Sequence, residues 1–346
     1  MRKVRLFAMA LCAAAGALAA TAGSAQAATI IVNPGQSIQA AVDAANPGDT
    51  VLVRPGNYHE EVLIQKDRIK LQGSMATISP PPFSSSPCGS AGVCVAGNVD
   101  FNTGQIFSYV HGVTVTGFLI TGFDDFGIVA FAAFNSIFTN NHTTGNGEYG
   151  ITAFSSSSTT IANNVTEGSG EAGIYIGDSP DSKASVHDNA TMRNAFGILY
   201  RNSGGGFIKH NTVNHNCAGV LAVADAPGPA SAVTIQNNTV FANSSFCFTD
   251  DAGPVSGAGI VLAGADHAVV HGNNVQFNAP SGFSVFNGGI VVVSGGLGTP
   301  ANHNTIAGNT ALNNSPDLFW DGFGVNTFAN NNCKTSVPSS LCHGGS

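Results

Sequence analysis

Charged side chains are scarce in this chain. Of its 346 residues, 12 are Lys or Arg and 20 are Asp or Glu, so charged residues make up only 9% of the sequence. A formal net charge of −8 with so few cations excludes the basic surface that nucleic acid or an anionic membrane would bind. Amphipathic runs rich in Leu, Ala, Glu and Lys are missing too, which excludes helical repeats.

Apolar runs long enough to span a membrane are also absent. The longest lies at the N-terminus, over residues 6–20, where it follows three basic residues and precedes a small-residue cleavage site that ends at Ala27. These features predict a secretory signal peptide over residues 1–27 and a soluble, secreted mature protein. Removal of the three basic residues changes the net charge from −8 to about −11.

A glycine followed by a branched aliphatic residue recurs through the middle of the chain, and an asparagine follows about a dozen residues later. The pairs are Gly127-Ile128, Gly150-Ile151, Gly173-Ile174, Gly197-Ile198, Gly219-Val220, Gly259-Ile260 and Gly289-Ile290. The asparagines are Asn141, Asn164, Asn189, Asn211, Asn238, Asn274 and Asn309. The first glycine spacings are roughly 22–24 residues, a period typical of a solenoid whose units bury their apolar faces against one another.

The residue types between the glycines identify the kind of solenoid. Val, Ile, Phe and Thr alternate with small residues over short stretches that Gly, Asn and Ser interrupt, which is typical of short strands and tight turns. Coils of a parallel β-helix lie about 4.8 Å apart, so asparagines at equal positions can form ladders of amide hydrogen bonds. We interpret the repeated asparagines as architectural.

We therefore predict an all-β fold: a single-domain parallel β-helix of about ten coils over residues 28–346. Residues 38–45, with Ser37 as N-cap, are expected to form a helix that plugs the N-terminal end. A Pro- and Ser-rich segment at 79–98 is expected to be a surface excursion, and residues 333–346 a polar C-terminal tail. A monomer is expected.

Six cysteines remain after the predicted signal, which contains Cys12. An even number in an exported protein predicts disulfides, although six cysteines allow fifteen pairings. None of the pairs has the spacing of zinc ligands, so no metal site is expected from them. Proximity in the sequence suggests two loop clips and one bond between adjacent coils: Cys88–Cys94, Cys333–Cys342 and Cys217–Cys247.

Three features of the chain resemble the right-handed parallel β-helix (pectin lyase-like) superfamily of PbH1-type repeat proteins. They are the opening segment, the Gly-Ile coils and the Asn corners. The opening contains Ser37-Ile38-Gln39-Ala40-Ala41, Pro47-Gly48-Asp49-Thr50-Val51 and Pro55-Gly56-Asn57-Tyr58. The resemblance covers nearly the whole mature chain and implies a right-handed helix. It does not select a function, because the superfamily includes pectate lyases, polygalacturonases, mannuronan C5-epimerases and adhesin-like proteins.

Basic residues gather in two consecutive coils, over residues 173–216. Residues 71–182 and 210–333 contain no Lys or Arg at all. The two coils hold cations, acids, histidines and tyrosines together: Tyr175, Asp178, Asp181, Lys183, His187, Asp188, Arg193, Tyr200, Arg201, Lys209, His210 and His215. In so uncharged a chain, this concentration is the strongest functional signal.

Strand alternation brings part of this cluster together. If Ile174 and Ile198 point into the core, Tyr175 and Arg201 face outward on neighbouring coils, and Asp178 at the strand end is within reach of Arg201. A base, an acid and a cation that neutralises a carboxylate are the groups needed to abstract a proton alpha to a sugar carboxylate. We therefore expect a lyase or epimerase acting on an extracellular polysaccharide. Its candidate catalytic residues are Tyr175, Asp178 and Arg201.

The strand Tyr175-Ile176-Gly177-Asp178 is also similar to the strand of mannuronan epimerases in which a catalytic Tyr precedes an Asp-Pro-His by three residues. Here Asp178 is followed by Ser-Pro-Asp, so the histidine would have to come from elsewhere, such as His187 or His210. Together with Lys183 and Lys209, these two histidines are the candidate substrate-binding residues.

Three alternatives stay open. A glycoside hydrolase would use paired acids, and Asp124-Asp125 and Asp250-Asp251 are adjacent pairs, although neighbours on a strand face opposite ways. A non-catalytic protein would bind glycans or surfaces along its lateral face. The charged cluster is also expected on a solvated surface without a function, where each ion pair stabilises the fold by about 0–1 kcal/mol.

Three other features concern a candidate cofactor, a candidate sugar-stacking residue and a lid over the outward-facing apolar rows. Calcium is the one candidate cofactor, through Asp178, Asp181 and Asp188. Trp320 beside Asp321 fits a sugar-stacking platform or the edge of a coil. The outward rows through Val129 and Phe131 are apolar enough to need a cover, and the insertion after Val223 is the nearest candidate lid.

Overall fold

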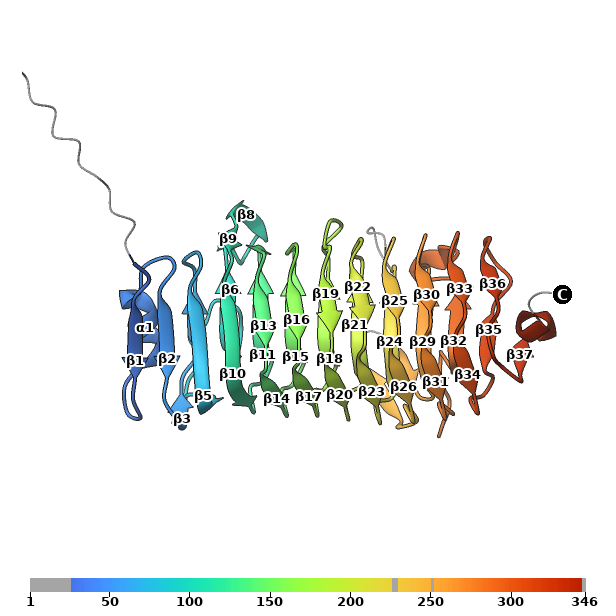
Figure 1. Cartoon of the computed structure of the whole chain (residues 1–346), viewed down its shortest axis with the longest axis horizontal. Coiled ribbons are helices and arrows are strands. Elements are labelled where there is room, and N and C mark those ends of the chain that lie inside the picture. Colours follow the sequence, from blue (N-terminus) through green and yellow to red (C-terminus); the bar gives the residue numbers. More distant parts are fainter. Residues whose placement is uncertain (1–25, 226–229, 250–251, 344–346) are drawn as a thin grey trace, which may run out of the picture.

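The computed structural model describes residues 26–225, 230–249 and 252–343. The predicted signal peptide falls almost wholly on residues outside the described part. The described chain winds into a long solenoid of stacked coils (Figure 1), and its two large sheets are parallel throughout, with 20 and 11 strands. No helix among the described residues is long and apolar enough to cross a membrane.

The larger sheet, here called the first sheet, bends around two sides of each coil. Its strands are β1 (Thr29–Val32), β2 (Thr50–Val53), β3 (Gly56–His59), β5 (Lys70–Ser79), β10 (Thr114–Thr121), β13 (Ile137–Thr139), β14 (His142–Thr144), β16 (Thr160–Ala162), β17 (Val165–Glu167), β19 (Ser185–His187), β20 (Ala190–Met192), β22 (Phe207–Lys209), β23 (Thr212–Asn214), β25 (Thr234–Gln236), β26 (Thr239–Phe241), β30 (Val269–His271), β31 (Asn274–Gln276), β33 (Thr305–Ala307), β34 (Thr310–Leu312) and β36 (Thr327–Ala329).

The smaller sheet, here called the second sheet, takes one strand from each coil. Its strands, in spatial order, are β4 (Val62–Ile64), β6 (Ala91–Ala96), β11 (Phe126–Phe131), β15 (Tyr149–Phe154), β18 (Ala172–Gly177), β21 (Phe196–Arg201), β24 (Ala218–Val223), β29 (Ala258–Ala263), β32 (Gly288–Val293), β35 (Leu318–Trp320) and β37 (Ser336–Val337). Eleven such strands agree with the prediction of about ten coils.

Short elements decorate the coils. The hairpin β7 (Asn98–Asp100) and β8 (Gln105–Ser108), the pair β9 (Val110–His111) and β12 (Ala133–Phe134), and the hairpin β27 (Cys247–Thr249) and β28 (Gly253–Val255) form three small sheets. Two 3-10 turns, η1 (Gly296–Gly298) and η2 (Ser339–His343), lie near the C-terminal end.

The core of the coils is an aliphatic column that the repeat glycines predicted. The residue after each glycine pairs with its equivalent on the next strand of the second sheet and is fully buried: Ile128, Ile151, Ile174, Ile198, Val220, Ile260 and Ile290. Burial of each such side chain stabilises the fold by about 1.5–3 kcal/mol. The inward direction of Ile174 and Ile198 is therefore confirmed.

The asparagine ladder is also present. Asn189 Nδ2 donates to Asn211 Oδ1 over 3.0 Å, and its backbone N–H donates to the same oxygen. The ladder comprises Asn141, Asn164, Asn189, Asn211, Asn238, Asn273, Asn309 and Asn331. The prediction of Asn274 was wrong by one residue. The ladder residue follows a corner residue in the left-handed region, here Gly272 with φ of 65°, so the ladder position is Asn273 and Asn274 is exposed.

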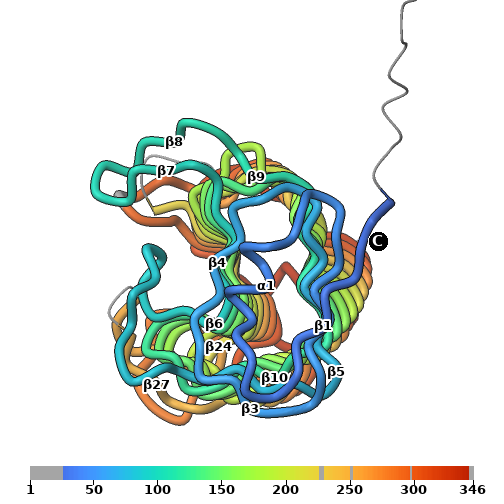
Figure 2. Tube along the Cα trace, turned by 90° about the vertical axis from the view of Figure 1, so that its left-hand side faces the viewer, coloured from blue at the N-terminus to red at the C-terminus, as the bar shows by residue number. Residues whose placement is uncertain are grey.

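The N-terminal end is closed by the predicted helix, α1 (Ile38–Ala44). Ser37 Oγ accepts a hydrogen bond from the backbone N–H of Ala40 over 3.1 Å, and Glu60 accepts from the N–H groups of Ile38 and Gln39. Ile38 is fully buried in the main core cluster. The helix therefore covers the apolar end of the first coils (Figure 2).

The segment 79–98 is an excursion only in part. Its last third forms β6, whose six residues are all buried and which pairs with β4 and β11 inside the second sheet. The prediction gave weight to Pro and Ser at the start of the segment and missed the alternating Val93 and Val95, which point into the core.

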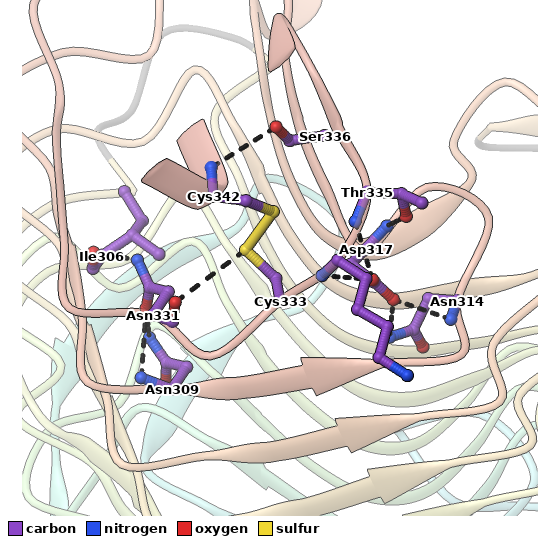
Figure 3. Close-up of a disulfide and its surroundings, with 10 residues drawn as sticks. Ile306, Asn309, Asn314, Asp317, Asn331, Cys333, Thr335, Ser336 and Cys342 are labelled. Carbon is purple, nitrogen blue, oxygen red and sulfur yellow. Dashed lines mark hydrogen bonds between the residues drawn. A yellow bond between two sulfur atoms is a disulfide. The ribbon is translucent and has the colours of Figure 1, made fainter. Parts of the chain in front are cut away.

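Three disulfides join the pairs that sequence proximity suggested, Cys88–Cys94, Cys217–Cys247 and Cys333–Cys342. Figure 3 shows the last beside the end of the asparagine ladder. The described part of the C-terminal tail, residues 333–343, packs against the end of the solenoid. It contributes β37 to the second sheet and buries Leu341 against the core, while the Asp317 carboxylate accepts backbone hydrogen bonds from Asn314, Lys334 and Thr335.

Candidate functional site

The outer face of the second sheet has the predicted register. Tyr175 pairs with Leu199 and with Thr152, and Gly177 pairs with Arg201 and with Phe154. These side chains point away from the core, but several do not reach solvent. Tyr175 is 2% exposed and Leu199 is 4% exposed, because they belong to a second apolar cluster that lies outside the coils. Outward direction therefore does not mean surface exposure here.

A hairpin covers part of this face. The strands β27 and β28 lie over it, Val255 of the hairpin is fully buried in the second apolar cluster, and the Cys217–Cys247 disulfide anchors the hairpin to the sheet. Figure 2 shows β27 and the β7–β8 hairpin on either side of the recessed stack of second-sheet strands. The predicted lid after Val223 includes residues 226–229, which lie outside the described residues, as do Asp250 and Asp251.

Three pockets follow one another along this face, and we call them together the groove. The first, of about 250 Å³, is aromatic: Phe101, Phe126, Phe131 and Phe154 line it with Val129. The central compartment, of about 500 Å³, shares Phe154 with the first. The third, of about 250 Å³ and mostly apolar, shares Arg201 with the central one. The groove thus runs along the solenoid axis across several coils.

Tyr175 forms the floor of the central compartment. Its ring stacks on Tyr149 with ring centroids 4.5 Å apart and contacts Phe154 at 5.0 Å. The phenol lies across Gly177, where a Cβ atom would overlap Cε1, Cζ and Oη of the tyrosine. Gly177 stands between Phe154 and Arg201 in the same row of the sheet. Because Gly177 has no side chain, the Tyr175 hydroxyl fits between Phe154 and Arg201.

Acidic residues line the central compartment on both sides of this tyrosine. Glu148 and Glu171 precede strands β15 and β18 by equal offsets, and the backbone N–H of Glu171 donates to the Glu148 carbonyl over 2.9 Å. Asp178 follows the end of β18, at the opposite end of the strand. The compartment therefore has two glutamates on one side and Asp178 with Arg201 on the other.

Arg201 has a fixed partner in the next coil. Its Nη2 lies 2.7 Å from Asp225 Oδ2, and both side chains are about a quarter exposed. Asn202 Nδ2 donates to Asp225 Oδ1 over 2.9 Å and to Asp178 Oδ1 over 3.4 Å, so the amide links the two carboxylates. Asp178 and Arg201 line the same compartment, as the sequence predicted for neighbouring coils.

The candidate binding residues are not at this site. Lys183 lies in an exposed turn and pairs with Asp181 over 2.9 Å. His187 and Lys209 are register partners on the first sheet, and His210 follows Lys209 into an exposed corner. These positions fall six to ten residues after the ends of the groove strands β18 and β21, so the coil carries them to another face. His187 and His210 therefore lie away from the central compartment, and a role for them in substrate binding stays a prediction.

The predicted calcium ligands also lie apart. Asp178 and Asp181 line one pocket, but Asp188 is 2.7 Å from His187 Nδ1 at the first sheet, so the three carboxylates do not converge on one point. Asp125 accepts a hydrogen bond from the Ser90 N–H over 2.8 Å, which is a structural role. Trp320 belongs to β35, near the C-terminal end of the second sheet, and packs on Phe328 at the coil edge.

The sequence prediction missed Glu148, Glu171, Asn202 and Asp225. One available signal was the column two residues before the repeat glycines, which reads Asp125, Glu148, Glu171 and then Ala195. Stacked acids at equal offsets mark a single edge of the sheet. Asn202 and Asp225 carried no such signal, because each stands in a turn without a repeated neighbour of its type.

No curated protein matches this sequence. Among solved structures, the fold is similar to the Geobacillus virus E2 protein ORF18, with a TM-score of 0.61 and 15% identity over 87% of this chain and 60% of that one. The chain therefore spans less than two thirds of the viral protein. It is also similar to the periplasmic alginate epimerase AlgG (TM-score 0.60, 13% identity, 83% and 77% covered). A third is the family 28 exopolygalacturonase of Yersinia enterocolitica (TM-score 0.54, 14% identity, 90% and 77% covered).

At these identities the structural likeness establishes the fold. Several of the similar structures are β-helix enzymes named for polysaccharides. The sequence itself matches a family model described as "Right handed beta helix region" over residues 69–240 and 127–306, which together cover more than half of the chain. With the stacked parallel sheets, the aliphatic column and the asparagine ladder, this match means that the chain belongs to the right-handed β-helix family.

Proposed function

We propose that the groove binds an extracellular polysaccharide and that the central compartment catalyses its modification. The observation that carries the proposal is the meeting of Tyr175, Asp178 and Arg201 around one compartment in the floor of a long groove. Aromatic walls such as Phe126 and Phe131 suit the apolar faces of sugar rings. A groove that extends over several coils suits a polymer better than a small molecule.

The chemistry that this set supports is proton abstraction alpha to a uronate carboxylate. Arg201, with its guanidinium at the compartment, would neutralise the carboxylate and stabilise the charge that develops when the proton leaves. Tyr175 and Asp178 would transfer protons. In a lyase, the electron pair of the broken C–H bond expels the glycosidic oxygen, which takes up a proton. In an epimerase, a proton returns to the same carbon from the opposite face.

A glycoside hydrolase is the second candidate, and the acids favour it. Glu148 and Glu171 face Asp178 from the opposite end of the groove strands, and two carboxyl groups across a sugar bond are the arrangement that hydrolysis needs. The same surplus of carboxylates repels a polyuronate unless cations such as calcium accompany the substrate. Neutral glycans would meet no such repulsion.

We also propose that the protein is secreted and oxidised outside the cytoplasm. Three disulfides in one chain are typical of exported proteins. This agrees with the signal peptide expected over residues 1–27.

A product screen tests the function. The secreted protein is incubated with uronate polymers and neutral polysaccharides, with and without calcium. An unsaturated product that absorbs in the ultraviolet identifies a lyase, inverted C5 centres seen by NMR identify an epimerase, and new reducing ends without absorbance identify a hydrolase. Binding without turnover would overturn the catalytic proposal and support a glycan-binding protein; neither binding nor turnover would overturn both.

A further inference from the structure

Three side chains gather on one corner of the solenoid, away from the compartment around Tyr175. Asp266 and His267 lie in the turn between β29 and β30, and His303 lies in the equivalent turn of the next coil, before β33. His267 Nδ1 is 2.9 Å from Asp266 Oδ2, and His303 Nδ1 is 3.0 Å from Asp266 Oδ1. One carboxylate thus faces two imidazoles, which stack with ring centroids 4.7 Å apart.

The backbone holds this arrangement in place. His267 and His303 both adopt the left-handed conformation, with φ of 54° and 52°. The N–H of His267 donates to the Asn302 carbonyl over 3.0 Å, and Asp266 forms a parallel bridge with Asn302. Because the two turns have the same shape and are hydrogen-bonded to each other, the histidines project from equal positions of adjacent coils. The backbone therefore keeps the three side chains close to one another.

We propose that Asp266, His267 and His303 bind a divalent metal ion such as zinc, copper, nickel or cobalt. One ligand atom of each residue lies within 4.8 Å of the other two. Bonds of 2.0–2.2 Å to a tetrahedral ion put neighbouring ligand atoms about 3.4 Å apart, a spacing that small side-chain rotations reach from the hydrogen-bonded state. Water would complete the coordination, since the site is open to solvent.

The ligand types select the class of ion. Two imidazoles and one carboxylate suit zinc, copper, nickel or cobalt, whereas calcium and magnesium prefer oxygen ligands alone. The bound ion would join consecutive coils between β30 and β33, which lie side by side in Figure 1.

Zinc binding is measured directly by calorimetry on the oxidised, full-length secreted protein, purified without a polyhistidine tag. The wild type is expected to bind one equivalent of Zn²⁺. His267→Asn and His303→Asn should each weaken binding at least tenfold, since even indirect partners of metal ligands change affinity by about 10–100-fold. His215→Asn is the matched control, because His215 is also exposed and left-handed, with φ of 54°. Asn tolerates that conformation, so the variants should fold.

Two further measurements keep the test decisive. Zinc should raise the melting temperature of the wild type and of His215→Asn, and leave those of the two cluster variants unchanged. Calcium should neither bind there nor raise the melting temperature. The proposal is overturned if the wild type binds no zinc, or if His267→Asn and His303→Asn bind it as tightly as the control does. Either result leaves the proposal for the groove untouched, because no residue of this cluster lines it.

Discussion

The two faces of the second sheet follow different rules. On the inner face, one column contains only Ile or Val in every coil from Ile128 to Ile290. One residue further along each strand, the outer column reads Val129, Thr152, Tyr175, Leu199, Leu221, Val261 and Val291. Repetition on the inner face follows from packing, because each coil must present the same apolar shape to its neighbours. The outer face is released from that demand, and it departs from the repeat where the central compartment forms.

The largest effect that distinguishes the two faces is expected on turnover, from a substitution on the outer face. Arg201→Ala removes the guanidinium that would neutralise a substrate carboxylate, so kcat/KM on a polyuronate should fall at least about a hundredfold, or about 2.7 kcal/mol. Arg193→Ala is the matched control, because Arg193 is exposed and pairs with Glu167 on the first sheet. Equal kinetics for the two variants would remove Arg201 from the mechanism.

A tyrosine on the inner face is expected to affect the pH dependence of stability. Tyr200 is fully buried in the core and donates a hydrogen bond to the Gly205 carbonyl. Burial raises its pKa from 10.0 to about 12. The neutral phenol therefore contributes stability below about pH 10, and a contribution on the order of 2–3 kcal/mol is lost as the pH rises toward 12.

Urea unfolding between pH 9 and 12 measures this loss. Tyr200→Phe should lower stability at neutral pH, because the hydrogen bond is lost, and should flatten the decline above about pH 10. An equally steep decline in the variant would show that other groups cause it.

The asparagine ladder offers a matched pair of neighbours. Asn273→Ala leaves the N–H and side-chain amide of Asn238 and the carbonyl of Ile235 without their partner, so the free energy of unfolding should fall by about 2 kcal/mol. Asn274→Ala should change it by less than about 0.5 kcal/mol, since Asn274 is exposed. Thermal melts of both variants test the ladder position, and the reverse order would contradict it.

A smaller effect is expected from Gly177→Ala. The added methyl group must displace the Tyr175 ring, at a cost of about 1–2 kcal/mol. The same substitution in a Tyr175→Ala background should cost much less, because the space is then empty. A double-mutant cycle of unfolding free energies measures this coupling. Equal costs in the two backgrounds would mean that the ring does not occupy the position above Gly177.

Much of the architecture could be predicted because it is repeated. Seven Gly-aliphatic pairs fixed the strands, their register and the direction of Ile174, since each coil gave the same information again. The positions of the candidate residues were predictable where they lie within a strand or directly after one, as Tyr175, Arg201 and Asp178 do. Equal offsets then placed them on neighbouring coils.

The differences between the expected and the observed placements have a common physical cause. His187, Lys209 and His210 were assigned to the site because they are near in the sequence, but the coil turns them onto the first sheet. Glu148 lines the compartment from the start of the groove strands, whereas Asp178 lies at their end. Proximity in the sequence does not reveal that the two residues line the same compartment. Tyr175 is covered by the rings of Tyr149 and Phe154, which come from the preceding coil, so its exposure could not be inferred from strand alternation alone.

The most direct test of the central claim compares two buried tyrosines in neighbouring coils, Tyr175 on the outer face and Tyr200 on the inner face. Both are replaced by Phe, and turnover is measured on the polysaccharide that the product screen identifies, after melting curves have established that each variant is folded. The account predicts that Tyr175→Phe loses at least about a hundredfold in kcat while Tyr200→Phe keeps the wild-type rate. Full activity in folded Tyr175→Phe would contradict the assignment of catalysis to the central compartment.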